Sequence, residues 1–232
     1  MQPIVLVPGL LCSAEVFASQ VAALWPFGPV TVASTLEGKT ISEMAAAILA
    51  AAPSRFALVG FSMGGYICLE IMRQAPERIL KLALLDTSAR PDTAEQSQQR
   101  RALVAAARTG DFRKLVSETL TFPHPSRKDD ANLREINLRM AMAVGVEGFA
   151  RQTEAIITRI DSRPSLSAIS VPTLVLVGDA DPFTPPERSE EIAAAIPNAR
   201  LTVVPHCGHG STLEQPDAVN KALIEWIAGP SR

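Results

Sequence analysis

Six short apolar segments recur along the chain, and each is continuously hydrophobic instead of alternating with polar residues. They are Ile4–Val7, Val30–Ala33, Phe56–Val59, Leu80–Leu85, Thr173–Val177 and Leu201–Val204. Helical patterns lie between most of them and after the last, at Ala14–Leu24, Ile41–Ala51, Met63–Gln74, Glu187–Ile196 and Ala218–Ile227. Continuous apolar strands that alternate with helices are typical of parallel sheets covered on both faces. The sequence therefore predicts an α/β fold with a doubly wound, mostly parallel sheet of about six strands.

The stretch from Ser88 to about Ser170 contains no convincing strand and interrupts this alternation. Four helices are predicted there, at Glu95–Arg108, Phe112–Leu120, Asp130–Val144 and Val146–Ile160. Gly110 and Gly145 stand where these helices would end. A chain of 232 residues is within reach of one α/β domain with an insertion. We expect residues 88–170 to form a helical lid over a core made of residues 1–87 and 171–232, with a second independent domain as the alternative.

Charge and cysteine content exclude several classes of function. The net charge is −2 and both signs are interspersed, so no basic surface for nucleic acid or an anionic membrane is indicated. The three cysteines lack a CxxC spacing, which argues against a disulfide framework and a zinc site. No apolar run approaches the ~18 residues of a membrane span, and no signal peptide is recognised at the start. We expect a soluble, cytoplasmic protein that acts on a small molecule.

The pattern G-x-S-x-G occurs at residues 60–64, where a predicted strand passes directly into a predicted helix. This context is that of a nucleophile elbow, in which the serine has a strained backbone and side chains two positions away would collide. The elbow explains both glycines and makes Ser62 the candidate nucleophile. An ordinary glycine-bearing turn between a strand and a helix is the alternative interpretation.

A serine hydroxyl needs an adjacent base, and the chain has three histidines. His124 lies in a proline-bracketed turn of the helical interval and is expected to be an exposed loop residue. His206 and His209 follow the last strand, at the carboxyl edge of the sheet where Ser62 is also expected. His209 lies between glycines and could place its ring over that edge, whereas His206 is nearer the strand and is expected to be a packing residue.

A carboxylate is expected to orient the histidine and stabilise its cation. Asp179 and Asp181 follow the fifth strand, again at the carboxyl edge. Asp86 follows the fourth strand and could reach the same space, although a capping or turn role is favoured for it. The order Ser, Asp, His matches that of hydrolases with this type of elbow. This reasoning leaves the choice between the two later aspartates open.

With these motifs, the sequence resembles an α/β-hydrolase-fold protein over the whole chain apart from the helical interval. Residues 178–185 match G-x-x-D-x-x-x-P, and residues 208–216 match G-H-x-x-x-x-E-x-P. The resemblance implies that Asp181 and His209 are the acid and base partners of Ser62. It also implies that the family's first two strands have no equivalent here, because Ile4–Val7 takes the place of the third.

The same resemblance implies an oxyanion hole made of the backbone N–H groups of Leu10 and Met63. The family's loop after the third strand usually reads His-Gly, whereas this chain has Pro8-Gly9. Because backbone groups hold the oxyanion, this replacement removes no donor. It leaves open how the loop is braced. Cys12, close by in sequence, is expected to be a small buried hydrophobe.

These residues predict a serine esterase of the carboxylesterase type. Ser62 would attack a small carboxylic ester and form an acyl-enzyme, His209 would move the protons, and Asp181 would hold His209, with no metal or organic cofactor. A carbon–carbon bond or thioester hydrolase of the same fold is one alternative. A ligand-sensing protein with slow or no turnover is another.

The substrate is only broadly indicated. Apolar residues in the helical interval favour an apolar ester, but an arginine there could receive an anionic group if it points inward; the candidates are Arg134, Arg139 and Arg151. An apolar stripe in the same interval could line an acyl pocket, although packing between helices is favoured for it. Its residues are Leu133, Ile136, Met140 and Val144. The sequence gives no indication of the oligomeric state.

Overall fold

A computed structural model describes residues 1–119 and 123–230 of the chain. Within these ranges, six parallel strands form one sheet in the order β2-β1-β3-β4-β5-β6. The strands are β1 (Ile4–Val7), β2 (Val30–Val32), β3 (Phe56–Phe61), β4 (Ile79–Leu85), β5 (Thr173–Gly178) and β6 (Arg200–Val204). All six predicted strands are confirmed, and so is the α/β fold with a parallel sheet.

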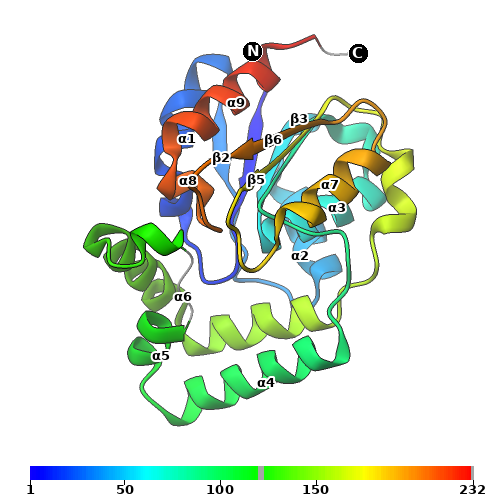
Figure 1. Ribbon diagram of the computed structural model, residues 1–232. Helices are drawn as coiled ribbons and strands as arrows, with labels where there is room; N and C mark the ends of the chain where they lie inside the picture. The colour runs from blue at the N-terminus through cyan, green and yellow to red at the C-terminus, as the bar shows by residue number, and fades with distance from the viewer. Residues whose placement is uncertain (120–122, 231–232) are drawn as a thin grey trace.

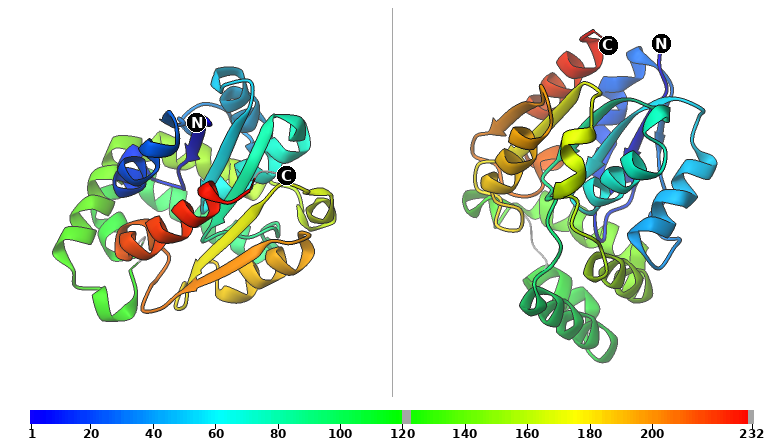
Figure 2. Two further views of the ribbon diagram at one scale, coloured as in Figure 1. Left: turned by 90° about the horizontal axis from the view of Figure 1, so that it is seen from above. Right: turned by 90° about the vertical axis from the view of Figure 1, so that its right-hand side faces the viewer.

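Helices cover both faces of this sheet (Figures 1 and 2). On one face lie α2 (Ile41–Ala51), α3 (Met63–Gln74) and α7 (Pro186–Ala195), and on the other lie α1 (Ala18–Leu24) and α9 (Pro216–Ala228). Alternate residues of one strand serve the two layers: Leu58 packs with the first group of helices and Val59 with the second. This double burial explains why the strands are continuously apolar.

Among the described residues, three α-helices lie between β4 and β5 in the sequence and beyond the carboxyl ends of the strands (Figure 1). They are α4 (Ala94–Thr109), α5 (Phe112–Thr119) and α6 (Ala131–Ile157). The third and fourth predicted helices are joined in α6, but Gly145 inside it has φ 72° and ψ 172°, so the predicted interruption is present as a kink. Leu120, the expected end of the second helix, lies outside the described residues.

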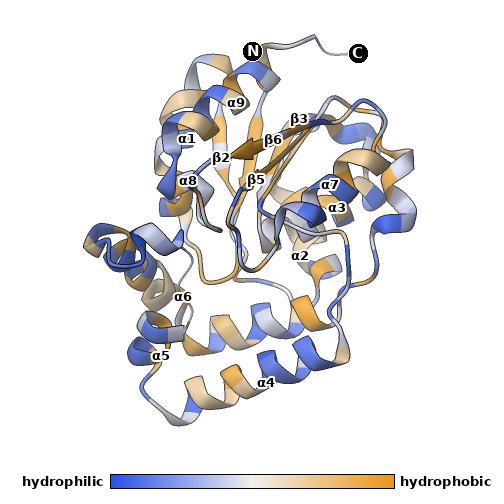
Figure 3. Ribbon diagram, viewed as in Figure 1, coloured by the Kyte–Doolittle hydropathy of each residue, from blue (hydrophilic) through white to orange (hydrophobic). Residues whose placement is uncertain are grey.

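The remaining helical elements are short. They are η1 (Ala14–Phe17), η2 (Trp25–Phe27), η3 (Pro76–Arg78), η4 (Pro125–Arg127), η5 (Arg163–Ala168) and α8 (Ser211–Glu214). Figure 3 shows hydrophobic residues along the strands and polar residues on the outer helices. Among the described residues, no helix combines the length and the apolar character that crossing a membrane requires.

The strand order creates a switch point beside β1. From β1 the chain moves outward to β2 and then returns past β1 to β3, so the loops after β1 and β3 diverge at neighbouring strand ends. Ligands of open α/β sheets bind at such points, beyond the carboxyl ends of the strands. The loop that begins at Pro8 and the turn at Ser62 both lie at this position.

Candidate active site

Ser62 stands on a sharp turn between β3 and α3. Its backbone has φ 53° and ψ −116°, a conformation that side chains rarely adopt. The turn is held because Ser62 N donates to Leu85 O at 2.9 Å, and Ser62 O accepts from Thr87 Oγ1 at 2.8 Å. A Cβ on Gly60 would collide with the backbone of Gly64, and one on Gly64 would collide with Val7 O. Both glycines are therefore required sterically.

The structure brings Ser62, His209 and Asp181 into one hydrogen-bonded line. His209 Nε2 lies 2.8 Å from Ser62 Oγ, and His209 Nδ1 lies 2.7 Å from Asp181 Oδ2. The three side chains come from the loops after β3, β6 and β5. His209 is 8% exposed and Asp181 is 3% exposed, so both are largely shielded from bulk water, whereas Ser62 is partly exposed. A neutral imidazole placed in this way can accept the serine proton.

Asp181 is fixed by its own loop. Its Oδ1 accepts from the backbone N–H of Phe183 at 2.8 Å and of Thr184 at 2.9 Å, and its Oδ2 accepts from Thr184 Oγ1 at 2.6 Å. The hydroxyl of Thr184 also lies 3.4 Å from His209 Nδ1. The sequence analysis missed Thr184. An aspartate followed by a hydroxyl residue in a turn was the signal that could have identified it.

The ionisation of this line follows from burial and pairing. Burial by itself disfavours the cation of His209, but the neighbouring Asp181 carboxylate outweighs it and holds the pKa of His209 above its usual value. Burial likewise disfavours the anion of Asp181. His209 and the hydrogen bonds from Thr184 outweigh that penalty, so the pKa of Asp181 lies below its usual range.

Asp86 is a second buried carboxylate beside this line, at the end of β4. It accepts a hydrogen bond from Gly178 N at 3.0 Å and another from Ser211 Oγ, so it ties the end of β5 to the segment after His209. Burial, together with repulsion from Asp181, raises the pKa of Asp86 well above its usual range. These contacts differ from the capping or turn role favoured from the sequence, because they join Asp86 to distant segments, while Asp181 is the carboxylate in contact with the histidine.

The other candidates from the sequence brace loops. Asp179 accepts from the backbone N–H groups of His206 and Cys207, both at 3.0 Å. His206 was expected to pack, and this is wrong: its side chain is exposed and its backbone has φ 53°, because the chain turns sharply there. His124 is partly buried, and its backbone N–H donates to Glu214 at 2.7 Å.

The loop after β1 lies against the turn of Ser62. Leu11 has φ 59° there, and its backbone N–H donates to the side chain of Gln152 at 3.0 Å. Gln152 comes from α6, is 1% exposed, and donates in turn to Thr35 Oγ1 at 3.0 Å. Within the described residues, the N–H groups of Leu10 and Met63 donate to no backbone carbonyl. The replacement of the usual histidine by Pro8 left open how this loop is held. Gln152, which the sequence analysis missed, is a side chain that holds it.

A cavity of about 390 Å³ opens onto Ser62 and His209. The rings of Phe61 and Phe183 flank the imidazole, with centroids 5.4 and 5.2 Å from it. Most of the wall is apolar. Its apolar residues include Leu10, Val16, Leu103, Met140, Ile156 and Leu213.

The stripe predicted in the helical interval has divided roles. Met140 lines the cavity, while Leu133 is buried and Val144 packs among the helices. Cys12 also lines the cavity; its Sγ lies 3.4 Å from Leu10 O, and burial raises the pKa of its thiol to about 12. A thiol with so high a pKa is a poor nucleophile.

The three arginines considered from the sequence do not line this cavity. Arg134 pairs with Asp129 and Arg139 with Glu15, and Arg151 lies on a separate surface depression beside Arg108. The arginine that does line the cavity is Arg100, on α4.

Comparisons with known proteins agree with this geometry. A family model described as alpha/beta hydrolase fold matches residues 39–216. An esterase from Thermogutta terrifontis is 29% identical, with a TM-score of 0.86 over 98% of this chain and 89% of that chain. An enol-lactonase from Burkholderia xenovorans LB400 is 26% identical, with a TM-score of 0.88 over 98% and 92%. A pimeloyl-acyl-carrier-protein methyl ester esterase of Pectobacterium carotovorum is 26% identical over 246 residues, covering 96% of this chain and 93% of that protein. The chain therefore belongs to the alpha/beta hydrolase fold family.

Proposed function

We propose that this protein hydrolyses esters of small carboxylic acids through a covalent acyl-enzyme on Ser62. The observation that carries the proposal is the line of contacts from Ser62 Oγ through His209 to Asp181, at 2.8 and 2.7 Å. Relatives named as an esterase, an enol-lactonase and a methyl ester esterase support carboxylic ester chemistry.

In the first half of the reaction, His209 Nε2 accepts the proton of Ser62 as Oγ attacks the ester carbonyl carbon. Asp181 holds the tautomer with a proton on Nδ1 and stabilises the imidazolium that forms. The tetrahedral intermediate collapses as His209 returns the proton to the departing alcohol. Water, deprotonated by the same imidazole, then attacks the acyl-enzyme and releases the acid.

The developing oxyanion needs donors already in place. The backbone N–H groups of Leu10 and Met63 are the proposed donors, because both lie at the switch point beside Ser62 and have no backbone acceptor within the described ranges. Met63 is the first residue of α3, so the positive end of the helix dipole adds to its effect. Gln152 keeps the other donor in position through Leu11.

We assign residues 88–170 the role of a lid over a core of residues 1–87 and 171–232. The support is that α4 and α6 both contribute side chains to the wall of the cavity. These are Gln96, Gln99, Arg100 and Leu103 from α4, and Asn137, Met140 and Ile156 from α6. A lid built in this way limits the size and charge of the substrate without touching the reacting atoms.

Labelling with a fluorophosphonate tests the proposal directly. The probe is expected to form one adduct, found by mass spectrometry on the peptide that contains Ser62, and Ser62→Ala is expected to abolish both labelling and hydrolysis of p-nitrophenyl esters. An unlabelled Ser62 would contradict the nucleophile assignment. Labelling without turnover above about one per minute on any ester would instead favour a ligand sensor, since enzymes typically turn over about 1–10³ times per second.

A further inference from the structure

The cavity beside Ser62 has an unequal distribution of charge. Among the described residues that line it, Arg100 is the only arginine or lysine, and no aspartate or glutamate is present. The wall also contains the hydroxyl residue Tyr66, Thr184 next to His209, and three amides. The amides are Gln96, Gln99 and Asn137. An apolar wall with one guanidinium and several amides is suited to a ligand that is apolar along its length and anionic at one end.

Arg100 and two of the amides are presented by one face of α4. Gln99 and Arg100 are neighbours, and each lies three or four positions from Gln96 and from Leu103, so the four share one side of the helix, and all four line the cavity. Along the helix, this face therefore changes from the polar Gln96 and Gln99 to the apolar Leu103, and Arg100 lies between them. Arg101, on the adjoining face, pairs at 3.5 Å with Glu154 instead.

Asp92 holds Arg100 in place without neutralising the site. Its carboxylate is 1% exposed, and it accepts from Arg100 Nε at 2.7 Å and pairs with Arg159 Nη1 at 2.8 Å. Two guanidinium groups therefore share one carboxylate, which leaves an excess of one positive charge. Within the described residues, the terminal nitrogens Nη1 and Nη2 of Arg100 donate to no other side chain or backbone group.

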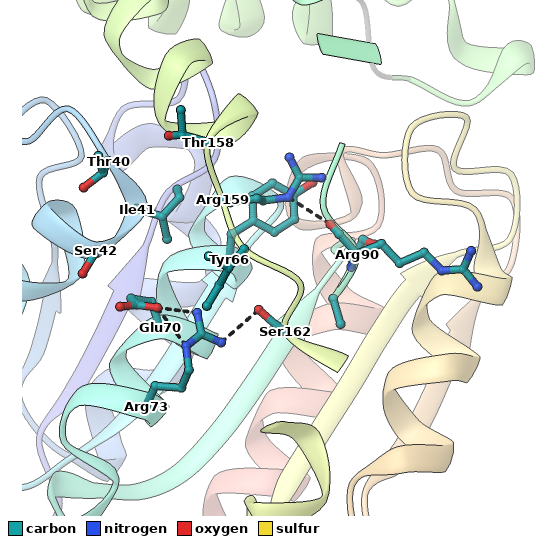
Figure 4. A pocket seen from close by; sticks show the side chains of 13 residues that line it. Thr40, Ile41, Ser42, Tyr66, Glu70, Arg73, Arg90, Thr158, Arg159 and Ser162 are labelled. Atoms are coloured by element: carbon teal, nitrogen blue, oxygen red, sulfur yellow. Dashed lines mark hydrogen bonds and ion pairs between the residues drawn. The ribbon is translucent and has the colours of Figure 1, made fainter. Parts of the chain in front are cut away.

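Arg159 does not compete for a ligand in this cavity because its own contacts are already made. Its guanidinium lies over the Tyr66 ring, 4.3 Å from the centroid, and its Nε donates to Arg90 O at 3.0 Å (Figure 4). It lines a second cavity, of about 210 Å³, which shares Tyr66 with the cavity beside Ser62 (Figure 4). The excess charge is therefore presented to the Ser62 cavity by Arg100.

We propose that the substrates are esters that carry a carboxylate, and that Arg100 binds this carboxylate while Ser62 attacks the ester carbonyl. This inference rests on the proposed function. The volume of the cavity, about 390 Å³, is at the small end of ligand sites and suits a short chain between the two groups. The expected class is monoesters of short dicarboxylic acids, or esters whose alcohol part bears a carboxylate. A neutral apolar ester, the class favoured by the sequence, would leave the terminal nitrogens Nη1 and Nη2 of Arg100 without an acceptor.

Matched substrates measure the effect of the charge. Monomethyl esters of succinic, glutaric, adipic and pimelic acids are compared with neutral methyl esters of the same chain length, and butanoyl esters of short hydroxy acids test a carboxylate on the alcohol side. The wild type is expected to prefer the best charged ester by at least about tenfold in kcat/KM. Arg100→Gln is expected to remove about 10- to 100-fold of that preference, mainly through KM, because a charge-assisted hydrogen bond is lost.

Two further variants separate recognition from structure. Arg100→Lys keeps the charge without the planar fork and is expected to retain part of the preference. Arg101→Gln is the matched control, since this neighbour has the same charge, is 59% exposed and does not line the cavity, and it is expected to behave as the wild type. If the wild type shows no preference, or if Arg100→Gln slows charged and neutral esters equally, the proposal is wrong.

A binding measurement keeps this inference separate from the chemistry. Glutarate is expected to raise the Tm of the wild type and of Ser62→Ala, whereas glutaramide, of equal length and no charge, is not. Arg100→Gln is expected to lose the response to glutarate and Arg101→Gln to keep it. Glutarate stabilisation without ester turnover would overturn the esterase proposal alone. Fluorophosphonate labelling and turnover without any response to glutarate or charge would overturn the carboxylate proposal alone.

Discussion

The carboxyl edge of the sheet and the helices of residues 88–170 build the site in different ways. At the edge, Asp181 is held by hydrogen bonds from Phe183 and Thr184, two and three positions further along. In the helices, Gln152 reaches Leu11 across 141 positions of sequence. Short loops at the sheet edge therefore position the proposed reacting groups. The helices contribute single side chains, whose positions depend on tertiary packing.

This contrast predicts two kinds of effect of substitutions on activity. A change at the edge alters the reacting groups themselves, so it should affect every substrate alike. A change in the helices should act through the position of a loop or the fit of a substrate, and its effect should be smaller and more selective. The three predictions below test that division, and the charge preference assigned to Arg100 tests the selective part of it.

The largest effect is expected from Asp181→Asn at the sheet edge. An amide in this place can donate to His209 Nδ1 and so favour the tautomer that cannot accept the serine proton; the same change in a serine protease lowers turnover by about 10⁴-fold. In the wild type, the pKa that governs the acid limb of the kcat/KM profile should lie above the ordinary histidine value of about 6.5. In Asp181→Asn, this limb is expected to move to lower pH.

The sign of that movement follows from the carboxylate. Asp181 raises the pKa of His209, so removing its charge lets the imidazole stay neutral at lower pH. A pH–rate profile of both proteins measures the two limbs. An acid limb that stays in place in Asp181→Asn would indicate that another group, such as Asp86, controls the ionisation of His209.

A smaller effect is expected from Gln152→Leu in α6. The donor N–H of Leu10 remains, but the loop beside it loses a support, so kcat should fall by about tenfold, less than the 10²–10³-fold cost of removing a donor. Leu11 N and Thr35 Oγ1 lose buried partners, which should cost about 1–3 kcal/mol of stability. Steady-state kinetics and chemical denaturation measure the two effects.

Gln152→Glu is the matched variant, because it keeps an acceptor for Leu11 and loses the donation to Thr35. It is expected to recover part of kcat. Equal loss of kcat in both variants would show that the bond to Thr35, and not the bond to the loop after β1, is the important one.

The smallest effect is expected from breaking the exposed ion pair between Arg108 of α4 and Glu147 of α6. Arg108 Nη2 lies 2.9 Å from Glu147, but their side chains are 52% and 66% exposed, so solvent screens the attraction. Glu147→Gln should leave kcat/KM unchanged and Tm within about 2 °C of the wild type. A larger loss of activity would indicate that the placement of α4 against α6 depends on this pair.

The sequence was informative where short motifs meet strand ends. The strands, the elbow and the placement of Ser62, Asp181 and His209 all follow from local patterns, because parallel strands bring their carboxyl ends to one edge. The error at His206 has a local cause as well. Proximity to a strand suggested packing, but the backbone turns to positive φ there and directs the side chain outward.

Helical periodicity, in contrast, could not identify the residues that face the site. It predicted α4 and α6, but the rotation and placement of a helix depend on contacts with distant segments. Arg100, Arg134 and Arg139 are equivalent as sequence letters, and only tertiary packing decides that the first lines the cavity. The role of Gln152 depends likewise on loops that are far away in sequence.

The contact between Gly64 and the carbonyl of Val7 limits how this protein can change over generations. Every other amino acid carries a Cβ, and at this position that atom would force α3 away from the end of β1. No gradual series of substitutions passes through such a site, since the first step already separates the proposed nucleophile, Ser62, from the proposed oxyanion donor at Leu10. Variation in substrate range is therefore expected in the other parts of the cavity wall, including the helices of residues 88–170, while the junction of the two loops stays fixed.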